Sequence, residues 1–354
     1  MTQPVGPVML DLEGTRLRRE EAELLRRPEV GGVILFSRNT EDAAQVQALC
    51  AAIRRVRPDL LLAIDQEGGR VQRLRHGVTR LPSMAALTQG YEEDAETVLH
   101  HCQDAGWLLG MEMAACGLDV TFAPVLDVDG GTSTVIGDRS FSADPQAVAR
   151  MGGAFIAGLH DAGMVAIGKH FPGHGGVAAD SHHECPVDAR SLDELRQHDL
   201  IPFAALASRL DGIMPAHVVY SAFDDKPAGF SRSWIGLLRE ELGFKGAIFS
   251  DDLSMAAAGV AGSAGDRALA ALEAGCNMAL VCNDRAAAIE ALDACLGRLT
   301  KRPAKLRYGR ARPSLDALPA LSRWRRVHAR LEALHPAPNK IDSSASNSHQ
   351  EDNG

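Results

Sequence analysis

One glycine-rich segment, residues 168–184, concentrates the side chains that are most capable of chemistry. It contains four histidines, one lysine and two carboxylates. The segment follows the apolar run Met164–Ile167, a pattern that predicts a strand leading into a polar loop. Loops held by a rigid scaffold carry much of the function of proteins, and the glycines at residues 172–176 are expected to form a hinge. The segment is therefore the first candidate for a functional site.

Asp180 and His182 form a candidate acid/base pair within this segment. In an extended chain, side chains two residues apart project to the same side. The Asp180 carboxylate can therefore accept a hydrogen bond from the His182 ring while His183 points elsewhere. A carboxylate partner fixes the imidazole tautomer, and a positioned histidine can accelerate proton transfer by about 10²–10⁴-fold. The alternative is a surface loop whose histidines have no role.

The same segment raises the alternative of a metal site. The possible ligands are His170, His174, His182 and Glu184. Their spacing matches no common zinc pattern, and the glycines between them would hold ligands poorly. Neither a metal nor another cofactor is therefore expected.

Two consecutive acids, Asp251 and Asp252, end the apolar segment 246–250. Asp is favoured at the N-cap of a helix, so one of the two could simply begin the next helix. A carboxylate at the end of a strand can also attack the anomeric carbon of a sugar and form a covalent glycosyl-enzyme. The pair leaves room for both roles, and the alternation of side chains along a strand does not assign them.

A second glycine-rich turn, residues 65–73, contains Asp65 and Glu67 at its start. A phosphate-binding loop is disfavoured, because two acids would repel a phosphate and no Gly-Lys-Ser/Thr sequence follows. Carboxylates in such a turn instead suit hydrogen bonding to the hydroxyls of a neutral sugar. Arg73, Arg139 and Lys169 could donate to sugar oxygens, or each could form a structural ion pair.

Short apolar runs alternate with segments of helical length, which predicts an α/β fold, a (β/α)8 TIM barrel. A doubly wound open sheet is the alternative. The expected strands are Pro7–Leu10, Gly32–Phe36, Leu60–Ile64, Asp119–Ala123, Met164–Gly168, Asp211–Pro215, Gly246–Ser250 and Asn277–Val281. The expected helices are Thr15–Arg27, Glu41–Arg57, Ala95–Cys116, Pro145–Ala162, Leu192–Ser208, Arg232–Leu242, Asp266–Ala274 and Arg285–Leu299. Several should end at a left-handed glycine, namely Gly117, Gly163, Gly243 and Gly275.

A parallel barrel places its chemistry at the carboxyl ends of its strands. Polar and charged residues follow the expected strands at that end rather than the other, and they include Asp11, Asp65, Lys169, His217 and Asp251. A barrel would therefore bring together candidates that are far apart in the sequence.

The amino-acid composition indicates which binding partners are disfavoured and which cellular compartment is expected. The net charge of −9 gives no overall basic field for nucleic acid or an anionic membrane. No apolar run approaches the roughly 18 residues of a membrane span, and the first residues lack the features of a signal peptide. Seven scattered cysteines without Cys-x-x-Cys spacing indicate free thiols in a reducing compartment. We expect a cytoplasmic, monomeric protein.

The C-terminal region has a different character. A basic stretch, residues 298–312, leads into an expected helix, Ser314–Leu334, that carries four more arginines. A nucleic-acid patch is conceivable, but no aromatic residues are interleaved with the arginines, which favours a solvated helix packed against the barrel. We therefore expect a barrel domain at 1–300, a helical extension at 301–335 and a disordered tail at 336–354.

Four motifs in a fixed order make the sequence similar to glycoside hydrolase family 3. It closely resembles the single-domain bacterial β-N-acetylglucosaminidases, or β-hexosaminidases, of peptidoglycan recycling. Jointly the motifs are highly specific, whereas any one alone would be modest evidence. The similarity covers roughly residues 5 to 300 and rests on Asp65–Arg73, Gly137–Ser142, Lys169–Gly175 with Asp180–His182, and Phe249–Met255.

The resemblance assigns roles to individual residues. It implies that Asp251 is the nucleophile and that His182, partnered by Asp180, is the acid/base. In two-domain relatives the acid/base comes from a second domain. Here only a short extension follows the barrel, so a barrel loop is expected to supply that residue. The resemblance further implies that a non-reducing N-acetylglucosamine is bound by Asp65, Arg73, Arg139, Lys169 and His170.

The implied activity is that of a retaining exo-β-N-acetylglucosaminidase. The implied substrate is a small carbohydrate, N-acetylglucosaminyl-1,6-anhydro-N-acetylmuramic acid, with or without its peptide. A family 3 β-glucosidase, or a phosphorylase in which phosphate replaces water, would share most of the motifs and is the alternative. A non-catalytic sugar-binding barrel is disfavoured, because binding alone requires neither an acid at a strand end nor an Asp–His pair.

Overall fold

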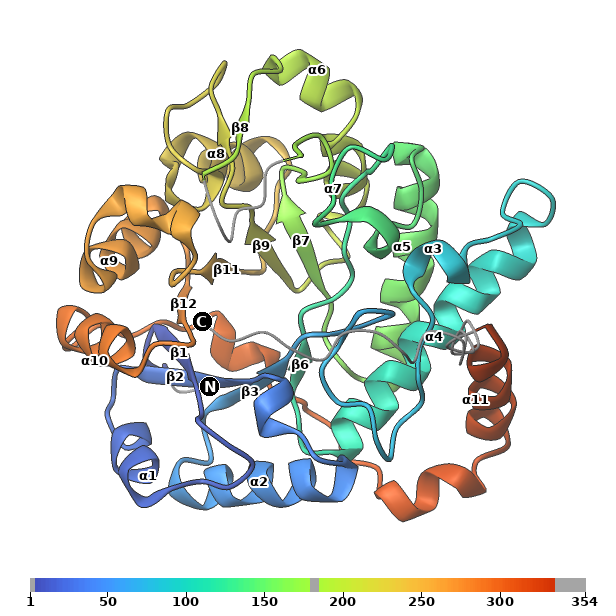
Figure 1. The fold of residues 1–354 in the computed structure, drawn as a ribbon, viewed down its shortest axis with the longest axis horizontal. Helices are drawn as coiled ribbons and strands as arrows, with labels where there is room; N and C mark the ends of the chain where they lie inside the picture. Colours follow the sequence, from blue (N-terminus) through green and yellow to red (C-terminus); the bar gives the residue numbers. More distant parts are fainter. Residues whose placement is uncertain (1–3, 179–184, 335–354) are drawn as a thin grey trace, which may run out of the picture.

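The computed structural model describes residues 4–178 and 185–334. Within these ranges, eight parallel strands surround a central axis (Figure 1). Each of them corresponds to one of the expected strands. They are β1 (Val8–Asp11), β2 (Val30–Leu35), β3 (Leu61–Ile64), β6 (Val120–Thr121), β7 (Ile167–Phe171), β9 (Gly212–Pro215), β11 (Ala247–Asp252) and β12 (Met278–Val281).

The strands pair in the order β6-β3-β2-β1-β12-β11-β9-β7. The two end strands are joined by parallel bridges, one between Val120 and Val165 and one between Val125 and Lys169. The sheet therefore closes on itself. This closure confirms the predicted (β/α)8 barrel and excludes the open, doubly wound alternative.

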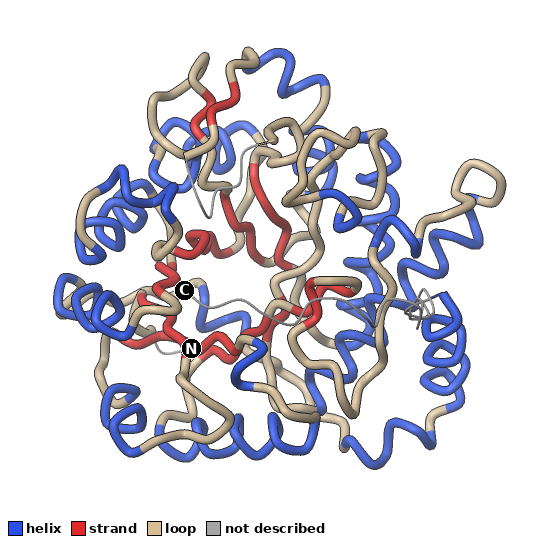
Figure 2. The backbone as a smooth tube through the Cα atoms, in the orientation of Figure 1, coloured by secondary structure: helices blue, strands red, loops and turns tan. Residues whose placement is uncertain are grey.

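Helices lie outside the ring of strands (Figure 2). They are α1 (Arg19–Leu25), α2 (Ala43–Val56), α3 (Met84–Leu87), α4 (Ala95–Ala115), α5 (Pro145–Ala162), α6 (Leu192–Gln197), α7 (Leu200–Leu206), α8 (Arg232–Gly236) with a π turn at Leu237–Glu241, α9 (Ala264–Ala274), α10 (Arg285–Ala294) and α11 (Ser322–Leu334). Two short strand pairs lie apart from the barrel sheet, β4 (Gln66–Gly68) with β5 (Val71–Gln72) and β8 (Val187–Asp188) with β10 (Val219–Tyr220).

Several expected helices differ in extent from the observed ones, and α1, for example, covers only Arg19–Leu25 of the expected 15–27. The segment 192–208 forms α6 and α7, because the backbone of His198 leaves the helical region at φ −138° and ψ −86°. The helix expected at 285–299 ends at Ala294. The segment 314–334 begins as a 3₁₀ helix, Leu315–Ala320, and continues as α11, since Pro319 has no amide hydrogen for a longer α-helix.

Apolar side chains fill the barrel interior and alternate along the strands with those that face the helices. Phe122 and Phe249 meet edge to face there, with ring centroids 5.2 Å apart. Fully burying a side chain of this size stabilises the fold by roughly 1.5–3 kcal/mol. These buried side chains form one apolar cluster inside the barrel, beneath the carboxyl ends of the strands. Its other large members are Met9, Ile34, Leu61, Ile167, Met214, Met278 and Leu280.

Helix α11 lies beside α4 at the edge of the barrel (Figure 1). Arg323 of α11 forms a 3.2 Å ion pair with Asp104 of α4, and upstream Arg312 forms a 2.5 Å ion pair with the buried Asp119. Arginines of this basic region thus neutralise carboxylates of the barrel. The apolar side of the helix is fully buried at Val327 and Leu331.

Three further expectations concern single residues or segments. In the part of the chain that the structure describes, no helix is long and apolar enough to cross a membrane. All seven cysteines lie in that part and are free thiols. The expected glycine caps are confirmed, because positive φ angles occur at Gly117, Gly163, Gly243 and Gly275.

Candidate active site

A cavity of about 450 Å³ opens at the carboxyl ends of the barrel strands. An apolar floor with a few convergent polar groups is typical of a small-molecule site. The floor consists of barrel-interior residues, namely Ile34, Phe122, Met214 and Leu280. The charged and polar groups around it include Asp65, Glu67, Arg70, Arg73, Arg139, Lys169, His170, His174, Asp251 and Asp252.

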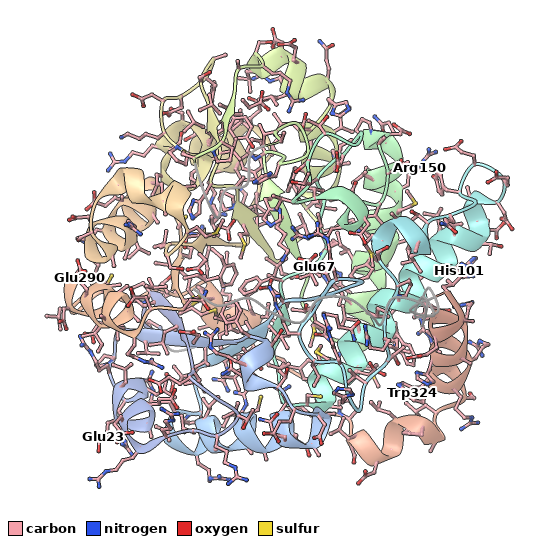
Figure 3. The ribbon with its side chains drawn as sticks, viewed as in Figure 1. Glu23, Glu67, His101, Arg150, Glu290 and Trp324 are labelled. Atoms are coloured by element: carbon pink, nitrogen blue, oxygen red, sulfur yellow. The ribbon has the colours of Figure 1, made fainter. Side chains whose placement is uncertain are left out.

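Four charged side chains form a network at one side of the cavity. The Lys169 ammonium lies 2.9 Å from Asp65 Oδ1 and 2.6 Å from Glu67 Oε1. Arg139 donates two hydrogen bonds of 2.8 Å to Glu67, from Nε to Oε2 and from Nη2 to Oε1. Such a bidentate pair fixes the orientation of both groups. Figure 3 shows Glu67 in the central part of the molecule.

Burial and pairing together determine the charges of this network. Burial opposes ionisation of Glu67, but the adjacent Arg139 and Lys169 outweigh it and hold the pKa of Glu67 below its ordinary value. Burial also disfavours the Lys169 ammonium, whereas Asp65 and Glu67 outweigh it and raise the pKa of Lys169. Both groups therefore stay ionised at neutral pH and present fixed charges to a ligand.

Arg73 and Arg139 differ in how many donors remain for a ligand. Arg139 donates from all three nitrogens to the protein, with Nη1 reaching the Val135 carbonyl oxygen at 3.1 Å. Arg73 Nη2 lies 3.7 Å from Asp65 Oδ2, and its buried Nε has no hydrogen-bond partner among the described residues. Arg73 is therefore the better placed of the two arginines to donate to a bound molecule.

Asp127 organises the two histidines of the segment that follows β7. It is fully buried, and its Oδ1 accepts a hydrogen bond from the backbone N of His174 at 2.7 Å. Its Oδ2 lies 2.7 Å from His170 Nδ1. Burial opposes ionisation of Asp127, but His170 outweighs it and lowers the pKa of Asp127. Because an ionised carboxylate can only accept, His170 Nδ1 carries the proton, and Asp127 fixes the tautomer of His170.

The two acids at the end of β11 have different surroundings. Asp252 Oδ1 accepts hydrogen bonds from the backbone N of Ser254 at 3.0 Å and of Cys282 at 3.2 Å. Its Oδ2 accepts from Asn283 Nδ2 at 3.1 Å. Asp251 lines the cavity, and within the described ranges its carboxylate accepts one hydrogen bond, from the backbone N of Asp252 at 2.8 Å.

The pKa values of these two acids move in opposite directions. Burial opposes ionisation of Asp251, but His217 and His170 outweigh it and lower the pKa of Asp251. Burial raises the pKa of Asp252, and the neighbouring Asp251 carboxylate adds to that effect. The surroundings of Asp251 therefore favour its ionised form at the cavity, whereas those of Asp252 favour ionisation less.

The glycines of residues 172–176 are held by close packing. A Cβ atom at Gly175 would lie 1.9 Å from the Val128 carbonyl oxygen, and one at Gly173 would lie 2.6 Å from Asp199 Cβ. The Tyr220 hydroxyl also donates to the Gly173 carbonyl oxygen at 2.6 Å. Glycine is required here because neighbouring groups approach the backbone closely. This packing argues against the expected hinge.

The structure brings six of the predicted site residues to one cavity, namely Asp65, Arg73, Arg139, Lys169, His170 and Asp251. The predicted acid/base pair, Asp180 and His182, lies outside the described residues, as does the possible metal ligand Glu184. Among residues 4–178 and 185–334, no group of three or more His, Cys, Asp or Glu side chains is arranged to hold a metal ion.

Glu67, Asp127 and His174 also belong to the site. The sequence offered Glu67 only as a carboxylate suited to sugar hydroxyls and His174 only as a disfavoured metal ligand, and it gave Asp127 no individual role. Asp127 lies in the loop after the fourth barrel strand, β6, and Glu67 lies shortly after the third, β3. A barrel assigns both positions to its active face, so this positional rule is the signal that could have identified them. Their partners are not evident from the sequence, because Arg139 and His170 are remote along the chain.

Comparisons with known proteins agree with this geometry. Residues 6–307 match the N-terminal domain of glycosyl hydrolase family 3. The chain is 58% identical over 299 residues to a β-hexosaminidase of Pseudomonas aeruginosa PAO1, which covers 84% of this chain and 88% of the relative. It is 50% identical over 344 residues to a β-hexosaminidase of Alkalilimnicola ehrlichii, which covers 94% and 98%.

Solved structures show the same relationship. NagZ from Neisseria gonorrhoeae in complex with N-trifluoroacetyl-D-glucosamine matches with a TM-score of 0.87 and 42% identity, over 94% of this chain and 98% of that one. A family 3 β-N-acetylglucosaminidase from Paenibacillus sp. str. FPU-7 matches with a TM-score of 0.76 and 33% identity, over 98% and 65%. Sequence and structure therefore agree that the chain belongs to glycosyl hydrolase family 3.

Proposed function

We propose that this β-N-acetylhexosaminidase is a retaining exo-β-N-acetylglucosaminidase that releases terminal N-acetylglucosamine from peptidoglycan fragments. The observation that carries the mechanism is the contrast at the end of β11. There the Asp252 carboxylate accepts three hydrogen bonds from the described chain, while the Asp251 carboxylate, which also lines the cavity, accepts one. A strand-end carboxylate with free lone pairs is what a covalent mechanism requires.

The proposed reaction has two displacements at the anomeric carbon. Asp251 attacks C1, and the bond from C1 to the leaving oxygen breaks as His182 donates a proton to that oxygen. His182 then takes a proton from water, the water oxygen bonds to C1, and the bond between C1 and Asp251 breaks. The two inversions retain the anomeric configuration. Asp180 is proposed to orient His182 throughout.

The charged network is proposed to bind the terminal sugar. Asp65 accepts from sugar hydroxyls, whereas Lys169 and Arg73 donate to sugar oxygens. His170, whose Nδ1 is held by Asp127, keeps its other ring nitrogen for the ligand.

The proposed natural substrate is N-acetylglucosaminyl-1,6-anhydro-N-acetylmuramic acid, with or without its peptide. Support comes from the family motifs and from the related Neisseria structure, which holds N-trifluoroacetyl-D-glucosamine, an N-acylated glucosamine. The cavity volume of about 450 Å³ falls within the roughly 300–1,000 Å³ of small-molecule sites. The enzyme is proposed to act in the cytoplasm as a monomer.

Turnover of a small panel of aryl glycosides tests this function. The expected result is fast hydrolysis of the N-acetyl-β-glucosaminide, slow hydrolysis of the β-glucoside, and no sugar phosphate when phosphate is added. Preference for the glucoside would indicate a β-glucosidase, and formation of N-acetylglucosamine 1-phosphate would indicate a phosphorylase. Binding of N-acetylglucosamine without any turnover would indicate a non-catalytic barrel.

A further inference from the structure

The turn that carries Arg73 continues to the outside of the barrel, where Thr79 is buried between two helices. The Thr79 backbone N donates to Glu112 Oε2 on α4 at 3.0 Å, and its hydroxyl lies 2.6 Å from Glu112 Oε1. The same hydroxyl lies 2.7 Å from Nδ1 of His328 on α11. Only 1% of the Thr79 surface is exposed, so these contacts are made in the protein interior. Thr79 therefore fixes the outer end of the turn.

Helix α11 supplies two more contacts at this junction. Trp324 Nε1 donates to Glu112 Oε1 at 3.0 Å, and the Trp324 ring stacks on His328 with 4.5 Å between centroids. Beside Thr79, the backbone N of Arg80 donates to Glu332 Oε1 at 2.8 Å. Figure 3 shows Trp324 at the periphery of the molecule, far from the central Glu67. The C-terminal helix thus holds the turn at its end remote from the cavity.

A buried glutamine links this outer junction to the cavity. Gln72 Nε2 donates to the Thr79 carbonyl oxygen at 2.9 Å, and Gln72 Oε1 accepts from the backbone N of Leu81 at 3.0 Å. Across the β4–β5 pair, Gln72 lies opposite Gln66. Arg73 follows Gln72 directly in the chain. The backbone that carries Arg73 is therefore tied to Thr79 by side-chain hydrogen bonds.

We propose that α11 is a positioning element for the active site, and that His328 sets the place of Arg73 through Thr79 and Gln72. The inference rests on the proposed function, in which Arg73 donates to the terminal sugar. Among the described residues, the nearest carboxylate oxygen to the Arg73 guanidinium is Asp65 Oδ2, 3.7 Å away. The guanidinium also lies over the Phe36 ring, 5.8 Å from its centroid, and the Thr40 hydroxyl donates to the Arg73 carbonyl oxygen at 2.9 Å. Its place therefore depends on its backbone together with these contacts. His328 is outside the cavity lining and acts through other residues.

Kinetics of full-length variants on an aryl N-acetyl-β-glucosaminide test the proposal. His328→Ala is expected to raise KM about fivefold with little change in kcat, which is the effect of one lost hydrogen bond on binding. His328→Asn returns a donor near the position of Nδ1 and is expected to restore the wild-type KM. The matched control is Arg326→Ala, on the exposed side of the same helix, which should leave both constants unchanged.

A double-mutant cycle with Arg73→Ala identifies the residue through which His328 acts. Once Arg73 is absent, His328→Ala should change KM by less than about twofold. An equal rise of KM in both backgrounds would overturn the proposal, and so would a lower Tm with a wild-type KM. If the wild-type protein shows no turnover, the proposed function fails. In that case, the affinity of the same variants for N-acetylglucosamine, measured by calorimetry, tests the positioning role. His328→Ala should weaken binding when Arg73 is present and have little effect when Arg73 is absent.

Discussion

The charged side chains on the two sides of the cavity differ in how closely they are paired with protein groups. Beside β3 and β7, Lys169, Glu67 and Arg139 are joined at hydrogen-bond distance. At the end of β11, the Asp251 carboxylate accepts one hydrogen bond from the described chain. Paired groups are fixed in place and suit recognition, whereas a carboxylate with free lone pairs suits attack on carbon. The difference supports the proposal that one side binds the sugar and the other reacts with it.

The largest effect is expected on the reacting side. Asp251→Ala should lower kcat/KM for an aryl N-acetyl-β-glucosaminide by about 10⁴-fold or more, because the nucleophile is lost. Asp252→Asn is the matched control at the next position. It removes part of a hydrogen-bonded carboxylate, so it should lower Tm while kcat stays within about tenfold of wild type. Wild-type hydrolysis by Asp251→Ala would end the proposed mechanism.

His182→Ala separates proton transfer from binding on the reacting side. The natural disaccharide needs a protonated leaving oxygen, so its kcat should fall by about 10²–10⁴-fold. An aryl substrate with a strongly acidic phenol as leaving group needs no proton in the first step. Its glycosylation rate, measured by rapid mixing, should fall far less. Equal losses on both substrates would argue for a structural histidine.

Glu67→Ala tests the paired side through stability. The substitution leaves the buried Lys169 and Arg139 charges without their shared partner, so the free energy of unfolding should fall by about 3–5 kcal/mol in urea titrations. Asp138→Asn removes an ion pair with Arg70 in which both side chains are 48% exposed. This control should cost less than about 1 kcal/mol. An equal loss of unfolding free energy in the two variants would show that burial does not increase the destabilisation caused by losing an ion pair.

Glu112 differs from Glu67, because its carboxylate is contacted by the hydrogen-bond donors of Thr79 and Trp324 rather than by cations. Burial raises the pKa of Glu112 from 4.5 to about 7. The folded state then binds a proton more tightly than the unfolded state, so stability should decrease as pH rises from about 5 to about 7. The pKa of Glu67 is lowered, so its effect on stability has the opposite dependence on pH. The stability that ionised Glu67 contributes is lost only as pH falls below the ordinary carboxyl range. Urea titrations of wild type and Glu112→Gln across this range check the first effect, which should be absent in the variant.

The sequence predicted the fold well because each barrel strand is a short apolar run flanked by helical periodicity. The rule that barrels react at their strand ends then placed Asp65, Lys169 and Asp251 on one face. The role of Asp127 was not predicted, because it depends on hydrogen bonds to His170 and His174. Contacts between residues distant in sequence leave no local pattern.

The glycines after β7 show a different limit. A glycine can serve backbone freedom or close packing, and the sequence does not distinguish these uses. At Gly175 the use is close packing, because a Cβ atom there would lie 1.9 Å from the carbonyl oxygen of Val128. The division of residues 192–208 into α6 and α7 is similar, because the buried Asp199 at the break pairs with Arg190 at 2.6 Å. That partner becomes evident only in the folded chain.

Covalent trapping tests whether Asp251 is the residue that attacks the anomeric carbon. A 5-fluoro glycosyl fluoride of N-acetylglucosamine should slow hydrolysis of the glycosyl-enzyme enough for proteolysis and mass spectrometry of the labelled peptide. The expected result is one added sugar per chain, attached to Asp251. A label on Asp252 or elsewhere, or complete turnover without any covalent adduct under conditions that trap other retaining glycosidases, would contradict it.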